Sequence, residues 1–574
     1  MILPSKLSIQ WLRRQYINGG ISPLQVVKAV IARAQAGDKM NIWITKPNMK
    51  LIKPYLDALK KRSLSKHKLW GIPFAIKDNI DLAGIPTTAA CCAYSYTPKE
   101  SAKAVKLLIA QGAIPIGKTN MDQFATGLVG TRSPYGEVCN ALNPEYISGG
   151  SSSGSAVCVA DGQAAFALGT DTAGSGRVPA MLNGIYGFKA SINAWDMQGV
   201  VPACESLDCL SVFANSIDDC IEVDGLVRQN GKLFLQTPDC ICLPKDELEF
   251  FGDFAQEYKN CWEEFKTNIS ETLRARGVEV KYVKNEIFRE TAKLLYDGPY
   301  IAERWASLGG FISKNENEIL PVTRKILESG KDKNFSAACL FDAFHKLQKY
   351  KKQVKEILKN AVLILPTAGG TFTRKQVAEN PVGTNNKMGL YTNHCNLLNL
   401  AAFAVPYKKT KSGFPFGVTA FSLSDKESYL PFSAGIISEL EKDVAFAVHG
   451  LHMNGMELNR DLKSLGAKFI KKTKTDKTYK LYALNTNPVK PGLVKVCSQG
   501  AQIETELWSL AQKDFAEFVS KADSPMSFGK IKLFDGSETF GFLCEPYAVK
   551  NAVEITSYGG WKSFYENEKR RSKK

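Results

Sequence analysis

Two clusters of glycine and serine lie near each other in the sequence and offer side chains for nucleophilic chemistry. The first spans residues 147–155 and contains Ser151, and the second spans 168–179 and contains Ser175, 24 residues further on. Glycines beside a serine let the backbone turn sharply and let its amide groups approach a substrate carbonyl. One such cluster is typical of a flexible loop, whereas two in succession favour a catalytic site.

A serine hydroxyl needs a neighbouring base to act as a nucleophile, and the sequence favours lysine over histidine for this role. The five histidines are His67, His345, His394, His449 and His452. None lies in either cluster, so a Ser-His-Asp triad is not expected in the first part of the chain. Lys77 follows a short apolar segment, and burial would lower the pKa of its amine enough for it to accept a proton. The alternative is an ion pair of Lys77 with Asp78 at a strand end.

Alternating strand and helix patterns surround these residues. The apolar segments 71–76, 113–116 and 361–366 predict buried strands, and 101–111 predicts a helix. Another helix is expected to begin at Ser22, because a capping serine is followed there by proline and apolar residues at helical spacing. We therefore expect an α/β fold with a mixed or parallel central sheet covered by helices.

One short motif in this region is misleading. Residues 112–119 satisfy the pattern G-x-x-x-x-G-K-T of a phosphate-binding loop. Such a loop must turn between a strand and a helix, whereas residues 113–116 are apolar and have strand character. We interpret the match as accidental.

The length of the chain and a change of pattern near residue 440 indicate two domains. The chain has 574 residues, and a single hydrophobic core stops growing at roughly 250–300 residues. A charged stretch at 438–443 is followed by short strand-like segments separated by glycine, proline and asparagine. We predict one domain over residues 1–440 and a second over 441–574.

Composition narrows the class of protein further. The fourteen cysteines include no Cys-x-x-Cys pair, so we expect no zinc site, no disulfide framework and no metal or cofactor. A net charge of +17 is compatible with RNA, but the lysines are dispersed and the run 569–574 is typical of a solvated tail, so no nucleic-acid partner is expected. Without an export signal or a long apolar run, the chain is expected to be cytoplasmic and free of the membrane.

The segments 71–79, 149–155 and 169–175 together resemble the amidase signature family, and 117–124 fits the same pattern. The resemblance covers about residues 20–435. It implies the amidase signature fold and a Ser-cisSer-Lys triad. By this resemblance Lys77 is the base, Ser151 is the bridging serine held by a cis peptide, and Ser175 is the nucleophile, with Ser152 as the alternative bridge.

The resemblance also implies a mechanism. Ser175 would attack an amide carbonyl, ammonia would leave, and water would hydrolyse the acyl-enzyme. The backbone amides of Thr172, Ala173 and Gly174 would form the oxyanion hole.

Within that family, the segments 131–136, 200–209 and 294–305 resemble allophanate hydrolases. Allophanate is a urea that carries a carboxylate, and a guanidinium can hydrogen-bond a carboxylate bidentately. The resemblance implies that Arg304 binds the carboxylate, that Tyr296 binds another polar edge and that Gly127 contacts the substrate. Alternatively, Tyr296 and Arg304 pack on one face of a helix.

The segments 450–459, 503–508 and 541–546 look like the C-terminal domain of allophanate hydrolases. This implies a smaller α+β domain, similar in fold to γ-glutamyl cyclotransferases, which is associated with processing the dicarboxylated product. His452 is the candidate catalytic residue there. A buried structural histidine is the alternative.

Taken together, the resemblance implies a homodimeric amidohydrolase that converts allophanate to ammonia and carbon dioxide in urea degradation. No biotin-dependent segment precedes the amidase region, so a separate urea carboxylase is the expected pathway partner. The alternatives are an amidase for other small amides, an amidotransferase A-like subunit, and a non-catalytic scaffold. Three retained polar groups argue against a scaffold.

Overall fold

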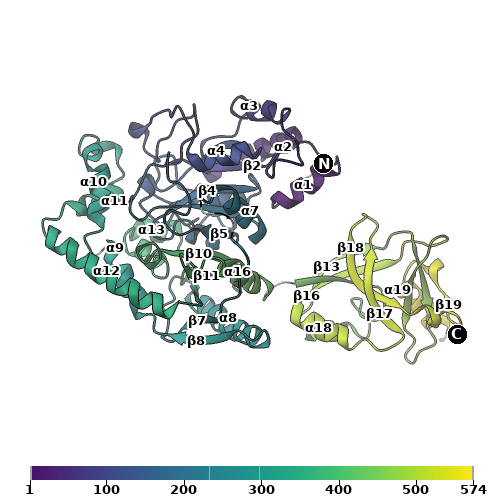
Figure 1. Cartoon of the computed structure of the whole chain (residues 1–574). Helices are drawn as coiled ribbons and strands as arrows, with labels where there is room; N and C mark the ends of the chain where they lie inside the picture. Colours follow the sequence, from purple (N-terminus) through teal and green to yellow (C-terminus); the bar gives the residue numbers. More distant parts are fainter. Residues whose placement is uncertain (1–2, 230, 232, 297, 441–442, 572–574) are drawn as a thin grey trace. The chain divides into compact units, whose positions relative to one another are not determined.

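The computed structural model describes residues 3–229, 231, 233–296, 298–440 and 443–571. The chain divides into two compact units, Met1–Ser438 and Glu439–Lys574. The predicted boundary lies at 440/441, close to this division. Each unit is described by itself (Figure 1).

The first unit is built on an eleven-stranded sheet. In sheet order its strands are β1 (Trp43–Thr45), β3 (Ile114–Thr119), β2 (Pro73–Lys77), β4 (Phe166–Asp171), β6 (Cys209–Ala214), β5 (Tyr186–Lys189), β10 (Leu400–Lys409), β11 (Pro415–Leu423), β9 (Ala361–Pro366), β7 (Cys240–Pro244) and β8 (Glu279–Val283). The neighbours β3, β2 and β4 are parallel, as are β9, β7 and β8, and the strands from β4 to β9 pair antiparallel. The sheet is therefore mixed, as expected from the sequence.

Helices cover this sheet (Figure 1). They are α1 (Ile9–Ile17), α2 (Pro23–Ala36), α3 (Met49–Leu59), α4 (Lys103–Ala110), α5 (Ser153–Ala160), α6 (Val178–Leu182), α7 (Ile217–Val227), α8 (Ala255–Ala275), α9 (Glu286–Tyr296), α10 (Ile301–Ile312), α11 (Pro321–Glu328), α12 (Ala337–Ile357), α13 (Arg374–Glu379), α14 (Gly383–Met388), α15 (His394–Leu397) and α16 (Tyr429–Glu439). The strands β2, β4 and β9 are buried along their whole length. Such strands form the core layer of an α/β fold, because helices protect both faces of the sheet.

The predicted elements of the first unit are confirmed. The helix that was expected at Ser22 is α2, and Ser22 caps it with a reciprocal pair of hydrogen bonds to Gln25. The apparent phosphate loop is the strand β3. A Cβ atom on its Gly117 would lie 2.4 Å from Thr45 O, so this glycine permits the close approach of β1 rather than a phosphate.

The second unit combines two sheets with three helices among the described residues. One sheet has the order β13 (Lys468–Lys474), β16 (Glu504–Ala511), β12 (Asp443–Val448), β18 (Glu538–Cys544) and β17 (Met526–Lys532), and the other has β15 (Pro491–Lys495), β14 (Tyr479–Ala483) and β19 (Val553–Glu554). The helices are α17 (Asn459–Ser464), α18 (Gln512–Ser520) and α19 (Trp561–Arg571). Buried apolar clusters form around Trp508 and around Trp561, so this unit has cores of its own.

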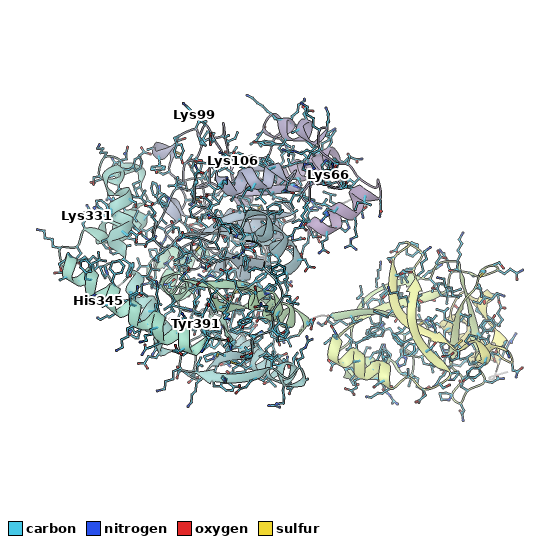
Figure 2. The ribbon with its side chains drawn as sticks, viewed as in Figure 1. Lys66, Lys99, Lys106, Lys331, His345 and Tyr391 are labelled. Carbon is cyan, nitrogen blue, oxygen red and sulfur yellow. The ribbon has the colours of Figure 1, made fainter. Side chains whose placement is uncertain are left out.

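The surface and the cysteines add two observations. The labelled lysines Lys66, Lys99, Lys106 and Lys331 project from different parts of the first unit (Figure 2), which fits a dispersed positive charge. All fourteen cysteines are free thiols. Among the described residues, no helix has the length and apolar character needed to cross a membrane.

Candidate active site

Lys77, Ser151 and Ser175 come from three segments of the chain and meet beside β2 and β4. Lys77 is the last residue of β2, Ser151 precedes α5, and Ser175 lies in the turn between β4 and α6. The Lys77 Nζ atom lies 2.8 Å from Ser151 Oγ, and Ser151 Oγ lies 2.9 Å from Ser175 Oγ. The peptide between Gly150 and Ser151 is cis. These contacts form a continuous path along which a proton can move from hydroxyl to amine.

The Lys77 amine is buried among polar groups that suit a base. Its Nζ also donates to Thr170 Oγ1 at 2.7 Å. Burial lowers the pKa of Lys77 to about 7, and the carboxylates of Asp122, Asp208 and Asp171 act in the opposite direction. With a pKa near neutrality, the amine has a substantial neutral fraction at pH 7 and can then accept a proton.

Ser152 is adjacent to Ser151, but its hydroxyl meets different atoms. Ser152 Oγ donates to Thr170 O at 3.0 Å and accepts from the Thr170 N–H at 3.3 Å. These bonds tie the hydroxyl to the backbone of β4. The geometry therefore favours Ser151 over Ser152 as the bridging group.

A buried ion pair holds the turn that carries Ser175. The Asp171 carboxylate accepts two hydrogen bonds from the Arg177 guanidinium, each 2.9 Å long. It also accepts from the backbone N–H groups of Gly174 and Gly176, again at 2.9 Å. Burial raises the pKa of Asp171, but Arg177, Lys189 and the backbone N–H of Gly176 together lower it, and the pKa lies below its ordinary value. One ionised carboxylate thus fixes the backbone on both sides of Ser175.

The three residues expected to form the oxyanion hole are not equivalent. The Gly174 N–H is already donated to Asp171, which weighs against Gly174 as an oxyanion donor. Thr172 Oγ1 donates to Asp208 Oδ1 at 2.5 Å, which orients the part of the turn that precedes Ser175. The backbone amides of Thr172 and Ala173 remain the candidates.

Two of the three expected substrate-binding residues, Gly127 and Arg304, lie near each other. Arg304, in α10, is buried, and its Nη1 donates at 3.3 Å to the hydroxyl of Thr126, which precedes Gly127. Burial raises the pKa of Asp208, and the Arg304 guanidinium acts against this, so the guanidinium lies near the carboxylate that accepts from the Thr172 hydroxyl. The side chain of Tyr296 lies outside the described residues.

The histidines of the first unit occupy other environments. His394 is fully buried, with its ring centroid 5.2 Å from that of Phe288 and 4.9 Å from that of Phe421. Burial lowers the pKa of His394 to about 3, so it is neutral and packs as an aromatic ring. His345 is exposed.

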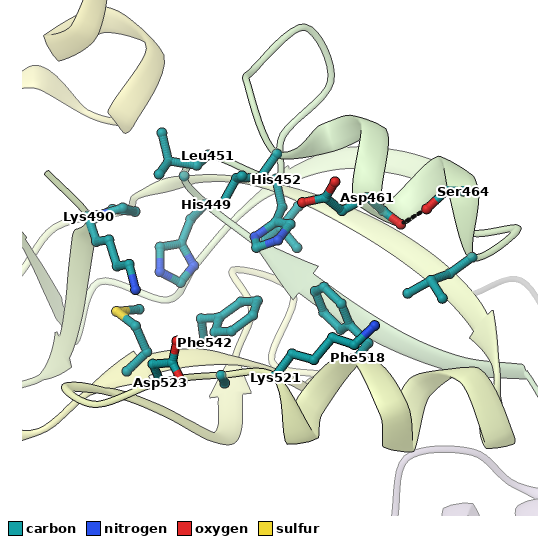
Figure 3. Close-up of a pocket in the computed structure, with 17 residues that line it drawn as sticks. His449, Leu451, His452, Asp461, Ser464, Lys490, Phe518, Lys521, Asp523 and Phe542 are labelled. Atoms are coloured by element: carbon teal, nitrogen blue, oxygen red, sulfur yellow. Dashed lines mark hydrogen bonds between the residues drawn. The ribbon is translucent and has the colours of Figure 1, made fainter. Parts of the chain in front are cut away.

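In the second unit, His452 lines a cavity of about 480 Å³. Figure 3 shows His449, His452, Asp461, Lys490 and Phe542 among the residues that surround this cavity. The rings of His452 and Phe542 stack with centroids 5.4 Å apart. Burial lowers the pKa of His452 to about 4, so its imidazole is neutral at pH 7. His449 is buried, and neither of its ring nitrogens has a hydrogen-bond partner among the described residues.

Several polar residues that complete the first site were not predicted from the sequence. They are Thr170, Asp122, Asp208 and the pair of Asp171 with Arg177. A signal was present, because Thr170, Asp171 and Arg177 lie inside or beside the second serine cluster, and charged residues there require partners. Asp122 and Asp208 lie outside that cluster, in the segments 117–124 and 200–209 that carry the family resemblance, but nothing in those segments alone places the two carboxylates beside the serines.

Comparisons with known families agree with the division of the chain into two units. The family described as Amidase matches residues 25–430, and the family described as Allophanate hydrolase C-terminal domain matches residues 444–566. The chain is 35% identical to the urea amidolyase of Saccharomyces cerevisiae over 98% of this chain and 33% of the relative. The chain thus spans about a third of the length of the urea amidolyases it matches.

A solved structure and a further relative extend the comparison. The structure of Kluyveromyces lactis allophanate hydrolase aligns with a TM-score of 0.69 and 32% identity, over 98% of this chain and 100% of that chain. A glutamyl-tRNA(Gln) amidotransferase component of a Synechococcus strain is 29% identical over 71% of this chain and 92% of the relative.

Proposed function

The chain belongs to the amidase family, and from that premise we propose that it hydrolyses allophanate through Lys77, Ser151 and Ser175. The observation that carries the proposal is the unbroken contact path from the Lys77 amine through Ser151 Oγ to Ser175 Oγ. Neutral Lys77 accepts the proton of Ser151, which takes the proton of Ser175. The Ser175 oxygen then attacks the carbonyl carbon of the terminal amide.

The tetrahedral intermediate is stabilised by the backbone amides of Thr172 and Ala173. Removing one such donor typically costs about 10²–10³ in rate. As the intermediate collapses, the relay returns a proton to the leaving nitrogen, and ammonia departs. Water then attacks the acyl-enzyme, releases the dicarboxylated product and restores the Ser175 hydroxyl.

The substrate assignment is supported by Arg304. Its guanidinium is buried near Thr126 and Asp208, where it can face the carboxylate of a small anionic amide. The similarity to the K. lactis allophanate hydrolase extends over the whole of that chain, second unit included. The amidotransferase relative matches 71% of this chain. These observations favour allophanate over the substrate of an amidotransferase.

Ammonia release from allophanate, malonamate, biuret and acetamide tests this proposal. We expect a strong preference for allophanate that Ser175→Ala abolishes. Ser153→Ala is the matched control, because this buried serine of the same cluster faces Asn120 O and its loss should change the rate less than threefold. Activity on neutral amides without activity on allophanate would refute the substrate assignment and leave the amidase site intact.

Arg304→Gln separates recognition from chemistry. We expect a higher KM for allophanate, while the kcat/KM for acetamide changes little, because acetamide has no carboxylate for a guanidinium to bind. An equal loss for both substrates would assign Arg304 to the structure of the site rather than to recognition.

For the second unit, we propose that the cavity beside His452 processes the dicarboxylated product. A neutral imidazole can exchange a proton, and Lys490 and Lys521 line the same cavity together with Asp461 and Asp523. After ¹³C-allophanate is added, the ¹³C resonance of the dicarboxylated product should persist longer with the His452→Ala variant than with the wild-type protein. The first ammonia should be released at the wild-type rate. An unchanged lifetime of that signal would count against this role.

The same proposal includes a partner and an assembly. We propose that a urea carboxylase supplies the substrate. The similarity of the chain to about a third of the length of a urea amidolyase supports this connection with urea. A homodimer is proposed from the family resemblance, and its mass in solution is the direct test.

A further inference from the structure

We propose that Asp122 is a positioning residue of the amidase site, whose buried carboxylate holds the turn over residues 127–132 against the Ser151 segment and places its charge near the relay. This inference rests on the proposed function, because it concerns the same relay. It assigns a role to a residue that touches neither the nucleophile nor the expected substrate.

Asp122 links the relay serine to a neighbouring turn through both its backbone and its side chain. Its backbone N–H donates to Ser151 O at 3.1 Å. Its carboxylate accepts from the Gly130 N–H at 3.1 Å and from the Arg132 N–H at 2.9 Å, and the side chain is fully buried. Hydrogen bonds to a buried carboxylate are stronger than those between neutral groups, so Asp122 fixes the turn relative to Ser151.

Two glycines leave room for this carboxylate. A Cβ atom on Gly127 would lie 2.6 Å from Asp122 Oδ2, and one on Gly150 would lie 2.0 Å from the same oxygen. Gly150 directly precedes the bridging serine, and Gly127 is an expected substrate contact. The carboxylate therefore fills the space between the relay and the expected substrate side of the site.

The contacts continue from Asp122 toward the proposed recognition arginine. Arg132, whose backbone binds the carboxylate, donates from its side chain to Thr126 O at 2.9 Å. Arg304 donates to the Thr126 hydroxyl at 3.3 Å. One short loop thus connects Arg304 with Asp122, and Asp122 connects it with the Ser151 segment.

Charge gives Asp122 a second effect, on the base. Burial lowers the pKa of Lys77 to about 7, and among the opposing carboxylates Asp122 acts most strongly, followed by Asp208 and Asp171. Burial raises the pKa of Asp122, and the positive charges of Arg132 and Lys77 act against this. Arg177 likewise offsets the charge of Asp171, and Arg304 that of Asp208. Loss of the Asp122 charge therefore lowers the pKa of Lys77 further, and the base becomes neutral at a lower pH.

The pH dependence of Ser175 labelling by a fluorophosphonate tests this inference in the full-length protein. Wild-type labelling should rise with pH through about 7 as Lys77 loses its proton. In Asp122→Asn the midpoint should move by about one pH unit toward acid, and the plateau rate should fall about tenfold, because one backbone N–H loses its acceptor. Asp219→Asn is the matched control: this buried carboxylate of the same unit accepts from Ile9 N, and its loss should leave the midpoint unchanged.

The outcomes separate a charge effect from a purely structural one. A uniform loss of labelling with the wild-type midpoint would overturn the inference, because disorder of the turn lowers the rate without moving a titration. If thermal melts show that the Asp122→Asn variant does not fold, the Asp122→Ser variant is used in its place, because the small serine side chain leaves room for a water molecule.

The readout is also independent of the substrate assignment. Normal labelling together with inactivity on allophanate would refute allophanate hydrolysis and leave the role of Asp122 standing. Absence of labelling in the wild-type protein at every pH would overturn both the relay and the role of Asp122.

Discussion

The two units each bury a basic side chain at a candidate site, but they satisfy its hydrogen bonds differently. Lys77 has hydroxyl neighbours on two sides, Ser151 and Thr170. His449, also buried, lines a cavity, and its two ring nitrogens have no partner among the described residues. Buried polar groups are normally paired. The fold itself supplies partners to the Lys77 amine, whereas the described residues supply none to the ring nitrogens of His449.

The largest effect is expected from removing the assembled base. Lys77→Met should lower ammonia release about 10²–10⁴-fold, the usual contribution of a general base. It should not lower the melting temperature, because the variant no longer buries an amine. Lys106→Met, at a partly exposed surface lysine, is the control and should retain activity. A drop of less than tenfold in the Lys77 variant would mean that the contact path is not the working relay.

The independence of the two units can be tested at a buried tryptophan. Trp561→Ala should destabilise the second unit by about 3–5 kcal/mol, because Trp561 is 1% exposed and lies in a cluster with Leu481 and Ile555. Ammonia release by the first unit should persist. Calorimetry with parallel activity assays measures both effects. Tyr547→Ala, at an exposed ring, should cost less than about 0.5 kcal/mol. Simultaneous loss of ammonia release would show that the units are energetically coupled.

Acid should affect the second unit through its histidines. Burial lowers the pKa values of His449 and His452 to about 4, below the ordinary value of 6.5. The unfolded chain therefore binds more protons, and stability that is present above pH 6.5 is lost as the pH falls through 4, by up to about 3 kcal/mol for each histidine. Hydrogen exchange of residues 443–571 at pH 7 and pH 4.5 measures this. His449→Asn should reduce the pH dependence, and an unchanged dependence in that variant would contradict the assignment.

The smallest expected effect concerns the nucleophile turn. Gly174 has φ 144°, and a Cβ atom there would lie 2.4 Å from Thr392 Oγ1. Gly174→Ala should strain the turn by about 1–3 kcal/mol and lower kcat roughly 10- to 100-fold. Gly310→Ala, where a Cβ meets open space, should have no such effect. Equal kcat values for the two variants would show that the turn tolerates displacement.

Much of the first unit could be predicted because its signals are local. Apolar segments with the spacing of strands and helices predicted β2, β3, β9 and α4, and Ser22 predicted the start of α2. The order of strands in the sheet was beyond reach, because pairings such as β5 with β10 join residues about two hundred positions apart. No local pattern specifies such a contact.

The candidate site shows the same limit. The positions of Lys77, Ser151 and Ser175 followed from motifs, and the structure brings them together. Thr170 and Asp122 were missed because their importance comes from where the fold places their side chains. The occupied amide of Gly174 was also not foreseeable, since it depends on the rotamer of Asp171.

The separation of the relay along the chain has a consequence for how activity arises during folding. Ser175 is connected to Lys77 through Ser151 only after β2 has paired with β4, a parallel contact between segments about ninety residues apart. The hairpin of β17 and β18 joins near neighbours, and contacts of short sequence separation form faster than long-range ones. Recovery of Ser175 reactivity in a refolding chain therefore reports the pairing of β2 with β4, a contact between distant segments. A chain in which the β17–β18 hairpin has already formed remains inactive until this pairing occurs.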